Sequence, residues 1–244
     1  MSRLYKNIVI LTGAGISAES GLATFRSSNG LWNNHRVEDV ATVEGFQRNP
    51  ALVHDFYNEL KIEIQKAKPN PAHLAITKLQ KEYPGTVSVI TQNVDTLHEK
   101  AGNTNICHIH GQINQAVCLN CGHILETFGD VDTETTCPQC GISDMMKPNI
   151  VFFGENLLGM DKVEQLLQNC DLFISIGTSG VVFPAAAFVQ TAKYHGADTR
   201  EFTLEPTANN YYFDHHIYGP AGQTLPPFVD NLIRESRPEN GLPL

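Results

Sequence analysis

The amino-acid sequence predicts an α/β fold built on a doubly wound parallel sheet, into which smaller modules are inserted. Residues 8–11 form a short, wholly apolar run rich in β-branched residues, which is typical of a strand that is buried on both faces. Further strands are predicted at 86–90, 172–176 and 201–204. Helical patterns lie between these predicted strands, and strands that alternate with helices form parallel sheets covered by helices.

The first apolar run continues directly into a glycine-rich turn. Residues 13–18 read Gly-Ala-Gly-Ile-Ser-Ala, which is the G-x-G-x-x-A form of the dinucleotide fingerprint. Glycines let the backbone approach a pyrophosphate, and free N–H groups at the start of the following helix attract its charge. The segment behind the turn is crowded with polar side chains, namely Ser17, Glu19, Ser20, Thr24 and Arg26. A Rossmann-like nucleotide site is therefore expected here.

The composition is that of an ordinary globular protein. The chain has 244 residues, of which 41% are hydrophobic and 18% charged, and its formal net charge is -9. This negative charge argues against non-specific binding to nucleic acid or to an anionic membrane. No apolar run approaches the roughly 20 residues that span a bilayer, and the first one is too short for a signal peptide. We expect a cytoplasmic protein with no nucleic-acid or membrane partner.

Four of the six cysteines form two Cys-x-x-Cys pairs, Cys118 with Cys121 and Cys137 with Cys140. Fifteen residues separate the pairs, a spacing typical of a zinc ribbon. Four cysteine ligands leave no open coordination position, so one structural zinc ion is expected. Two disulfides are the alternative, but nothing else in the sequence indicates an oxidising compartment. The other two cysteines are interpreted as buried, inert thiols.

The remaining patterns divide the chain into modules. Asn-Pro pairs at 49–50 and 70–71 predict two helix starts, and the apolar residues between 52 and 64 form one helical stripe. Further helical patterns lie at 161–168, 184–194 and 227–235. We predict a Rossmann-like nucleotide-binding domain made of 1–30, 69–116 and 148–244, and a small domain made of a helical module (31–68) and a zinc-binding module (117–147).

Each predicted strand ends in a cluster of small or polar residues. These clusters lie at 13–15, 92–95, 177–179 and 203–205. The carboxyl ends of parallel strands meet at one edge of the sheet, where such folds bind ligands. A dehydrogenase would also carry an acidic residue after its second strand, but Glu38 and Asp39 follow no strand. The P-loop pattern G-x-x-x-x-G-K-[ST] is absent as well. The nucleotide is therefore expected to be held differently from that of an ordinary dehydrogenase.

His110 is the candidate general base. It lies just ahead of the predicted zinc module, where two domains would meet, and a carboxylate and amides are expected nearby at 92–95. A single histidine is more often structural, and His108, His215 and His216 have no comparable surroundings. These three are interpreted as surface or packing residues.

Seven motifs then match a known family in order: GAGISAESG, TFR, TQNVD, HIHG, the two Cys-x-x-Cys pairs, FFGE and GTSG. Over essentially its whole length the chain resembles the sirtuins, NAD-dependent protein-lysine deacylases, and among them the bacterial members grouped with the desuccinylating class. The resemblance implies that Asn93 and His110 are catalytic, and that Phe25 and Arg26 lie near the nicotinamide ribose. It implies these contacts to NAD: Gly13, Ala14, Gly15, Ile16, Glu19, Thr24, Phe25, Arg26, Trp32, Gln92, Asn93, Val94, Asp95, His110, Gly177, Thr178, Ser179, Thr203, Leu204, Glu205 and Ala221.

The resemblance also implies the reaction. The acyl-lysine oxygen attacks C1′ of the nicotinamide ribose and expels nicotinamide, and His110 then deprotonates a ribose hydroxyl. The products are free lysine and O-acyl-ADP-ribose. Residues Val151, Phe152, Phe153, Gly154 and Glu155 would line the acyl-lysine tunnel and pair with the substrate backbone as an added strand. Protein substrates of acyl-CoA synthetase type fit the resemblance.

The sequence departs from the family pattern at two positions. The desuccinylating class carries Tyr-x-x-Arg in the acyl pocket, whereas this chain has Tyr57 followed by Leu60. Without the arginine, a buried succinyl carboxylate would have no cation, so we predict that deacetylation exceeds desuccinylation. Ala41 still matches the small residue that gives the pocket room. Thr203 replaces an asparagine that the family places against the adenosine ribose.

Two other functions remain open at this point. A zinc-containing NAD(P) oxidoreductase would share the glycine turn and the four cysteines, but it would need catalytic zinc ligands that are not visible. A non-catalytic zinc-ribbon adaptor would explain the cysteines alone, and the negative charge and the polar sheet edge argue against it.

Overall fold

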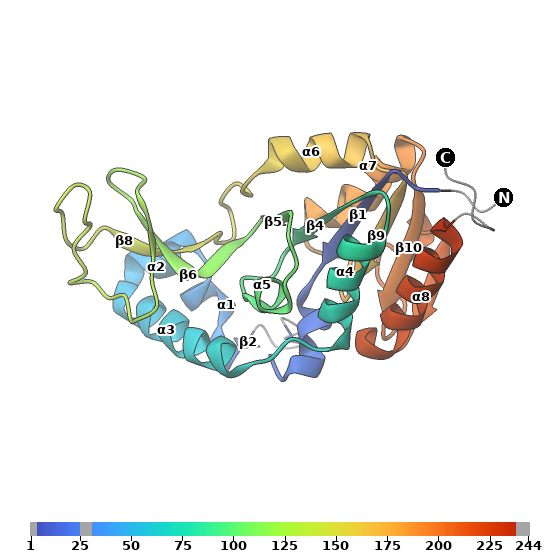
Figure 1. The fold of residues 1–244 in the computed structure, drawn as a ribbon. Coiled ribbons are helices and arrows are strands. Elements are labelled where there is room, and N and C mark those ends of the chain that lie inside the picture. Colours follow the sequence, from blue (N-terminus) through green and yellow to red (C-terminus); the bar gives the residue numbers. More distant parts are fainter. Residues whose placement is uncertain (1–3, 25–30, 238–244) are drawn as a thin grey trace.

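The computed structural model describes residues 4–24 and 31–237. Its centre is a six-stranded, wholly parallel sheet in the order β11-β10-β9-β1-β4-β5 (Figure 1). The strands are β1 (Asn7–Thr12), β4 (Thr86–Thr91), β5 (Ile106–His108), β9 (Leu172–Ile176), β10 (Asp198–Thr203) and β11 (His215–Tyr218). The predicted doubly wound parallel sheet is therefore confirmed, with two strands more than predicted.

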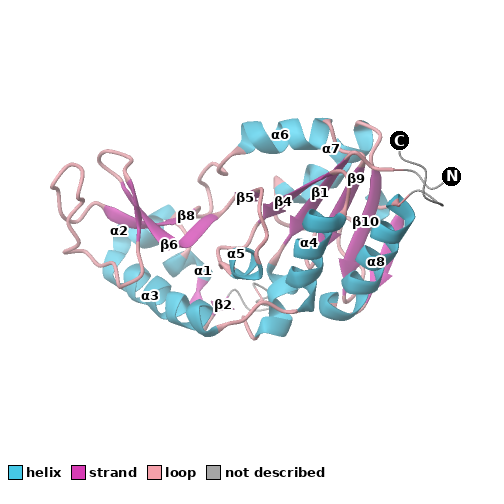
Figure 2. Cartoon of the chain, in the orientation of Figure 1, coloured by secondary structure: helices cyan, strands magenta, loops and turns pink. Residues whose placement is uncertain are grey.

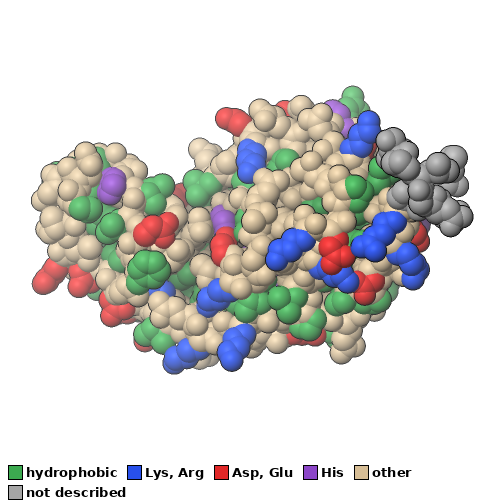
Figure 3. Space-filling model, viewed as in Figure 1, with side chains coloured by type: hydrophobic (Ala, Val, Ile, Leu, Met, Phe, Trp, Pro, Cys, Tyr) green, Lys and Arg blue, Asp and Glu red, His purple; other side chains and the backbone are tan. Residues whose placement is uncertain are grey.

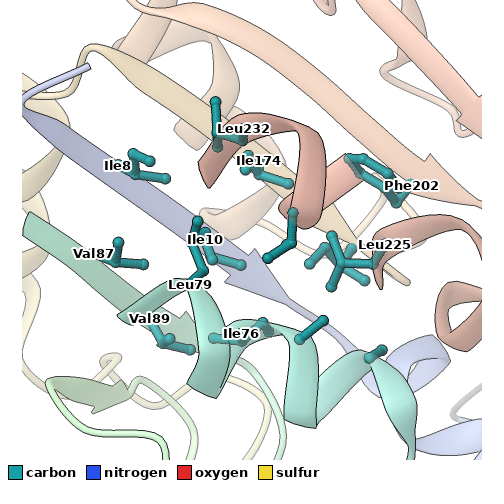
Figure 4. Close-up of a cluster of buried hydrophobic side chains, with 14 of the residues drawn as sticks. Ile8, Ile10, Ile76, Leu79, Val87, Val89, Ile174, Phe202, Leu225 and Leu232 are labelled. Atoms are coloured by element: carbon teal, nitrogen blue, oxygen red, sulfur yellow. The ribbon is translucent and has the colours of Figure 1, made fainter. Parts of the chain in front are cut away.

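Alternate residues of β1 pack against helices on opposite faces of the sheet. Ile8 and Ile10 contact a core that includes α4 (Pro71–Glu82) and α8 (Ala221–Ser236), as Figure 4 shows. Val9 and Leu11 belong to a second core that includes α6 (Met160–Gln168) and α7 (Phe188–Tyr194). This burial on both faces explains why the strand sequence is apolar without alternation.

The other elements form a smaller lobe beside this sheet (Figures 1 and 2). One part is a three-stranded antiparallel sheet of β6 (Gly111–Cys118), β7 (Ile124–Glu126) and β8 (Met146–Ile150). The other part contains a short hairpin and three helices: β2 (Leu31–Trp32), β3 (His35–Arg36), α1 (Val37–Val40), α2 (Val43–Arg48) and α3 (Pro50–Lys66). One apolar cluster joins α3 to β6 and β8. The module boundaries proposed after residues 116 and 147 lie within β6 and β8.

Both predicted Asn-Pro helix starts are present. The Asn49 side chain accepts a hydrogen bond from the Leu52 N–H at 3.2 Å, and the Asn70 side chain accepts one from the Ala72 N–H at 3.0 Å. Each cap satisfies a backbone donor that the first helical turn leaves without a partner. The Asn70 amide also donates to the Ile16 carbonyl at 2.7 Å, so the start of α4 holds the glycine-rich segment in place.

Three details differ from the predicted elements. Helix α8 begins at Ala221 rather than at Pro227, and both Pro226 and Pro227 lie inside it. The segment at 31–68 contains the β2–β3 hairpin as well as helices. The pattern at 184–194 divides into a short 3₁₀ helix at Ala185–Ala187 and α7. Within 4–24 and 31–237, no helix is long and apolar enough to cross a membrane.

Candidate functional site

A cavity of about 360 Å³ lies between the carboxyl ends of the parallel strands and the smaller lobe. Segments that follow β1, β4, β9 and β10 all contribute to its lining. Figure 3 shows the molecule divided into two lobes, with basic and acidic side chains interspersed over the larger one. The polar strand ends therefore meet at one edge of the sheet, as predicted, and line this cavity.

Two glycine turns form the floor of the cavity by close backbone contact. The Gly13 N–H donates to the Ile176 carbonyl at 3.0 Å, and the Gly15 N–H donates to the Gly177 carbonyl at 2.9 Å. A Cβ atom on Gly15 would lie 2.6 Å from the Gly177 Cα, and Gly177 itself has a φ of +63°. Both positions therefore require glycine, and the turn leaves room beside it for a ligand.

Behind this turn, three buried polar side chains bond to one another. The Ser17 hydroxyl donates to Asp95 Oδ2 at 2.8 Å and accepts from the Asn93 amide at 3.1 Å. Asp95 Oδ1 accepts from the Leu97 N–H at 2.9 Å. All three residues also line the cavity. The network fixes the Asn93 and Asp95 side chains at the cavity surface, as a site for a polar ligand requires.

His110 lies at the junction of the two lobes, one residue before β6, and lines the cavity. Its Nδ1 lies 2.8 Å from the Gln92 carbonyl oxygen, which can only accept a hydrogen bond. The Nδ1 therefore carries a proton, and in the neutral ring Nε2 is the acceptor. Burial lowers the pKa of His110, while its hydrogen bond to Gln92 opposes this shift. The ring is thus a neutral base at neutral pH.

An apolar chamber extends from His110 into the smaller lobe. Its residues include Ala41, Tyr57, Leu60 and Phe152, of which the last three belong to one apolar cluster. The Tyr57 ring stacks on the Phe152 ring with centroids 6.0 Å apart. The buried Tyr57 hydroxyl has no hydrogen-bond partner among the described residues, and burial raises its pKa well above the usual range. The chamber thus offers one neutral hydrogen-bond donor.

Glu155 and Lys147 hold the segment that closes this chamber. The Lys147 ammonium donates to both Glu155 carboxylate oxygens, at 2.9 and 2.7 Å, and to the Ile150 carbonyl at 2.9 Å. Glu155 also accepts from the Phe152 N–H at 2.7 Å, and the ammonium lies 3.9 Å from the centre of the Phe152 ring. The Phe153 N–H donates to the Ala41 carbonyl at 2.9 Å. These contacts fix the direction of the Phe152 side chain.

Most of the predicted site residues line this one cavity. They are Gly13, Ala14, Gly15, Thr24, Trp32, Ala41, Tyr57, Leu60, Gln92, Asn93, Val94, Asp95, His110, Val151, Phe152, Phe153, Gly154, Glu155, Gly177, Thr178, Ser179, Thr203, Leu204 and Ala221.

Three predicted contacts lie outside the lining. Ile16 is fully buried in the core. The Glu19 carboxylate accepts a hydrogen bond from the Gly222 N–H at the start of α8. The N–H and the carbonyl of Glu205 both form hydrogen bonds with the Thr203 hydroxyl. Phe25 and Arg26 lie outside the described residues.

Several lining residues were not predicted as site residues. Ser17 lies in the segment from Gly13 to Trp32 that the resemblance implies to wrap NAD, and its polar side chain so close to the glycine turn is itself a signal, but no individual contact is predicted for it. The apolar ones carry no such signal, because an apolar residue that faces a cavity has the same sequence pattern as one in a core. The unpredicted residues are Ser17, Ala18, Leu22, Ala23, Ile64, Ile150, Leu157, Val182, Phe183, Phe202 and Gly219.

The four predicted metal ligands meet at the tip of the smaller lobe. The sulfur atoms of Cys118, Cys121, Cys137 and Cys140 all lie within 4.8 Å of one another. The Cys118–Cys140 and Cys121–Cys137 sulfur pairs are each 3.7 Å apart. Tetrahedral zinc–thiolate bonds of about 2.3 Å place two sulfurs about 3.8 Å apart, so the cluster fits a structural zinc ion. The four thiols are not paired as disulfides.

The comparisons with known proteins agree with this site. A sequence model of the Sir2 family matches residues 13–184 of this chain. A protein of Vibrio parahaemolyticus serotype O3:K6 (strain RIMD 2210633) named NAD-dependent protein deacylase is 51% identical over 231 residues, which cover 94% of this chain and 96% of that protein.

Two solved structures share the fold. The complex of a Sir2 homologue with NAD is 34% identical with a TM-score of 0.87, and the match covers 96% of this chain and 91% of that one. A structure of Sir2 bound to acetylated peptide is 28% identical with a TM-score of 0.78, over 95% and 93% of the two chains. The family model matches most of this chain, and a relative is 51% identical to it over 94% of its length. The chain therefore belongs to the Sir2 family.

Proposed function

We propose that this chain is an NAD-dependent protein-lysine deacylase that transfers the acyl group to ADP-ribose and releases nicotinamide. One observation carries the proposal: His110, with Nε2 as its acceptor, lies between the glycine turns and the apolar chamber of a single cavity. A nucleotide on the turns and an acyl-lysine side chain in the chamber would meet at this base. The family membership supports the same activity.

Each part of the cavity then has a role. The glycine turns, with Gln92, Asn93 and Asp95, bind NAD, which supplies the ribose carbon that takes up the acyl oxygen as nicotinamide leaves. His110 Nε2 accepts the proton of a ribose hydroxyl, which makes that oxygen a nucleophile for the acyl carbon. Asn93 is the second catalytic residue, held by Ser17. The aromatic side chains of the chamber exclude water from the reacting atoms.

The acyl chamber favours neutral acyl groups. Leu60 is 7% exposed and packs in the apolar cluster, so it completes the chamber without a charge. The nearest cation in sequence, Lys61, points away from it, because its ammonium donates to the Thr127 hydroxyl at 3.1 Å and the Gly129 carbonyl at 2.7 Å. The other nearby cation, Lys147, is already paired with both carboxylate oxygens of Glu155, so it is not free to meet a second carboxylate. We therefore expect acetyl-lysine to be preferred over succinyl-lysine.

The substrate range and compartment follow from the same features. Protein substrates present the acyl-lysine on a polypeptide, and we include acyl-CoA synthetase-type enzymes among them on the family resemblance. A reducing compartment such as the cytoplasm suits four thiolates that hold a metal ion. The zinc ion is structural, because the four sulfurs leave no coordination position for a substrate.

The decisive experiment measures nicotinamide release from NAD with and without an acetyl-lysine peptide. Release that depends on the peptide, with free lysine and O-acyl-ADP-ribose as products, supports the proposal. The alternative, a zinc-containing NAD(P) oxidoreductase, would form reduced cofactor instead, and the comparisons do not support it. His110→Ala should lower turnover by roughly 10²–10⁴-fold while NAD still binds. Near-normal turnover in that variant would exclude His110 as the base.

A further inference from the structure

We propose that Lys100 is a positioning residue of the acyl chamber, because it joins the end of α3 to the larger lobe. Lys100 lies on α5 (Leu97–Ala101), which Figure 1 shows between the end of α3 and α4. Its ammonium donates to the carbonyls of Ile64, Gln65 and Ala67 at 2.8, 3.2 and 3.3 Å. Lys100 itself does not line the cavity. The inference rests on the proposed function, because it assumes that NAD and an acyl-lysine occupy the two parts of that cavity.

The end of α3 needs a partner from elsewhere in the chain. The last carbonyls of a helix have no partner within the helix, and here the Ala67 N–H satisfies the Glu63 carbonyl at 3.2 Å. Residues 67–71 read Ala-Lys-Pro-Asn-Pro, with no glycine for a left-handed cap and no N–H on either proline. The Lys100 ammonium, 33 to 36 positions further along the chain, supplies the donors instead. Its positive charge also suits the negative end of the helix dipole.

The backbone of α5 is fixed to the larger lobe on both sides of Lys100. Ahead of it, the Leu97 N–H donates to Asp95 Oδ1 at 2.9 Å, and Asp95 belongs to the buried network behind the glycine turn. After it, the Thr77 hydroxyl of α4 donates to the Ala101 carbonyl at 2.9 Å. Lys100 therefore extends from a backbone whose position is set by the proposed NAD site.

At the other end of these bonds, α3 carries the chamber. Tyr57, Leu60 and Ile64 follow one another at spacings of three and four residues, which places them on one face of the helix, and all three line the cavity. The Ile64 carbonyl accepts the shortest of the three bonds from Lys100. Lys100 thus fixes the position of this face of α3 relative to the network that contains Asp95.

The reaction depends on this position. The acyl oxygen must meet the ribose carbon of NAD, and a misplacement of about 1 Å can cost about 10²-fold in rate. Without the ammonium, water would replace Lys100 at the α3 carbonyls, and the end of α3 could move together with a bound acyl-lysine. The glycine turns belong to the larger lobe and would stay in place. The effect should therefore fall on the acyl-peptide and on kcat, and not on binding of the nucleotide.

The variants Lys100→Met and Lys100→Arg test this role. Methionine keeps most of the apolar stem and removes the ammonium, whereas arginine keeps a positive charge with several N–H donors. We expect Lys100→Met to raise the KM for acetyl-peptide and to lower kcat/KM for that peptide at least about 10-fold, a part of the loss that misplacement can cause. The Kd of ADP-ribose, measured by calorimetry, should not change. Lys100→Arg should recover most of the activity.

Lys66→Met is the matched control. Lys66 lies in the last turn of α3 and is exposed, so it carries the same charge near the same end of the helix. Within residues 4–24 and 31–237, however, its side chain forms no hydrogen bond or ion pair with the larger lobe. This control separates the loss of a favourable charge at the helix end from the loss of the link between the lobes. Lys66→Met should keep the wild-type KM for acetyl-peptide.

Trp32, the one tryptophan of the chain, provides a measurement that does not depend on turnover. It lines the cavity, and its ring lies 5.0 Å from that of Phe56 and 6.0 Å from that of Tyr57, both on α3. A displacement of α3 should therefore shift the Trp32 emission maximum. We expect this shift in Lys100→Met and not in Lys100→Arg or Lys66→Met.

Unchanged peptide kinetics in Lys100→Met would overturn the proposal, and so would an equal loss in Lys66→Met or an equal weakening of ADP-ribose binding. If the methionine variant does not fold, Lys100→Gln takes its place. Its neutral amide keeps a weaker donor, so its KM for acetyl-peptide should lie between those of the wild type and a variant without a donor, and a wild-type KM would count against the proposal. A wild-type protein that does not deacylate, but whose Trp32 emission shifts in Lys100→Met, would refute the proposed function alone.

Discussion

At the scale of single residues, His110 sets the pH dependence of the reaction. Its neutral form is the base, and burial places its pKa below the ordinary value of 6.5. The fraction of neutral base therefore falls only when the pH drops through this lowered value. We expect the acid limb of kcat/KM to lie below pH 6.5, measured with acetyl-peptide at limiting concentration. An acid limb centred above that value would mean that the limb belongs to another group.

Leu60 is the residue that decides the acyl preference. Leu60→Arg would place a guanidinium beside the unpartnered Tyr57 hydroxyl, where both could meet a succinyl carboxylate. The ratio of kcat/KM for succinyl- over acetyl-peptide should rise at least about 10-fold, which corresponds to about 1.4 kcal/mol. Leu60→Met, which keeps the chamber apolar, is the control. A wild-type enzyme that prefers succinyl-peptide would contradict the assignment.

At the scale of elements, helix α3 contributes to the site through two of its faces. One face carries Tyr57 and Leu60 into the chamber, and the other holds the loop that follows β7. The Asn58 side chain makes two hydrogen bonds with the Val131 backbone, at 3.1 and 2.9 Å, and Lys61 binds the same loop. This contact fixes the smaller antiparallel sheet relative to the chamber.

Asn58→Ala tests that contact. Removal of the side chain leaves the Val131 N–H and carbonyl without these partners, and because the two bonds are only partly buried, we expect the loss to be about 1 kcal/mol. We expect a lower free energy of unfolding in urea and a higher KM for acyl-peptide, with little change in NAD affinity. Glu59→Ala, at an exposed position of the same helix, is the matched control. If both variants lost the same stability, the loss would come from the change to alanine within α3 and not from the contact between Asn58 and Val131.

The elements that could be predicted from the sequence are those with a strong pattern. Central strands such as β1 and β9 are mostly apolar because both of their faces are covered. Strands β5 and β11 lie at the two edges of the sheet, and β11 reads His-His-Ile-Tyr with two exposed histidines, so it lacks an apolar run. The last helical pattern was predicted to begin at 227, where proline is favoured in the first turn, whereas α8 begins at Ala221 and continues through Pro226 and Pro227.

In the cavity, too, some residues could be placed from the sequence and others could be placed only from the structure. The polar strand ends could be brought together from the sequence, because a parallel sheet places their carboxyl ends at one edge. The buried contact between Thr12 and His98 could not, since it joins residues 86 positions apart whose hydroxyl and imidazole groups resemble those of any core.

At the scale of the whole molecule, the metal ion should stabilise one lobe and leave the other folded. The apolar cluster around the cysteines is small: Ala116, Cys118, Val131, Cys137 and Met146 are its buried members. Two of these five are predicted ligands, so without the metal this cluster has little apolar area of its own. The two cores on either side of the parallel sheet contain none of the four ligands.

Removal of zinc should therefore abolish deacylation without unfolding the parallel sheet. Without the metal ion, the loop at 127–131 would no longer be held in position. It would then lose its hydrogen bonds to Asn58 and Lys61, which position α3 and the acyl chamber. We expect a chelator to release one zinc ion per chain, to weaken acyl-peptide binding more than NAD binding, and to preserve most of the helical circular dichroism. Cys121→Ala should reproduce these effects, whereas Cys170→Ala, at a buried cysteine outside the cluster, should retain zinc and activity. Full activity in protein shown to be free of zinc would refute this coupling, and so would loss of the helical signal in the same step as loss of the metal.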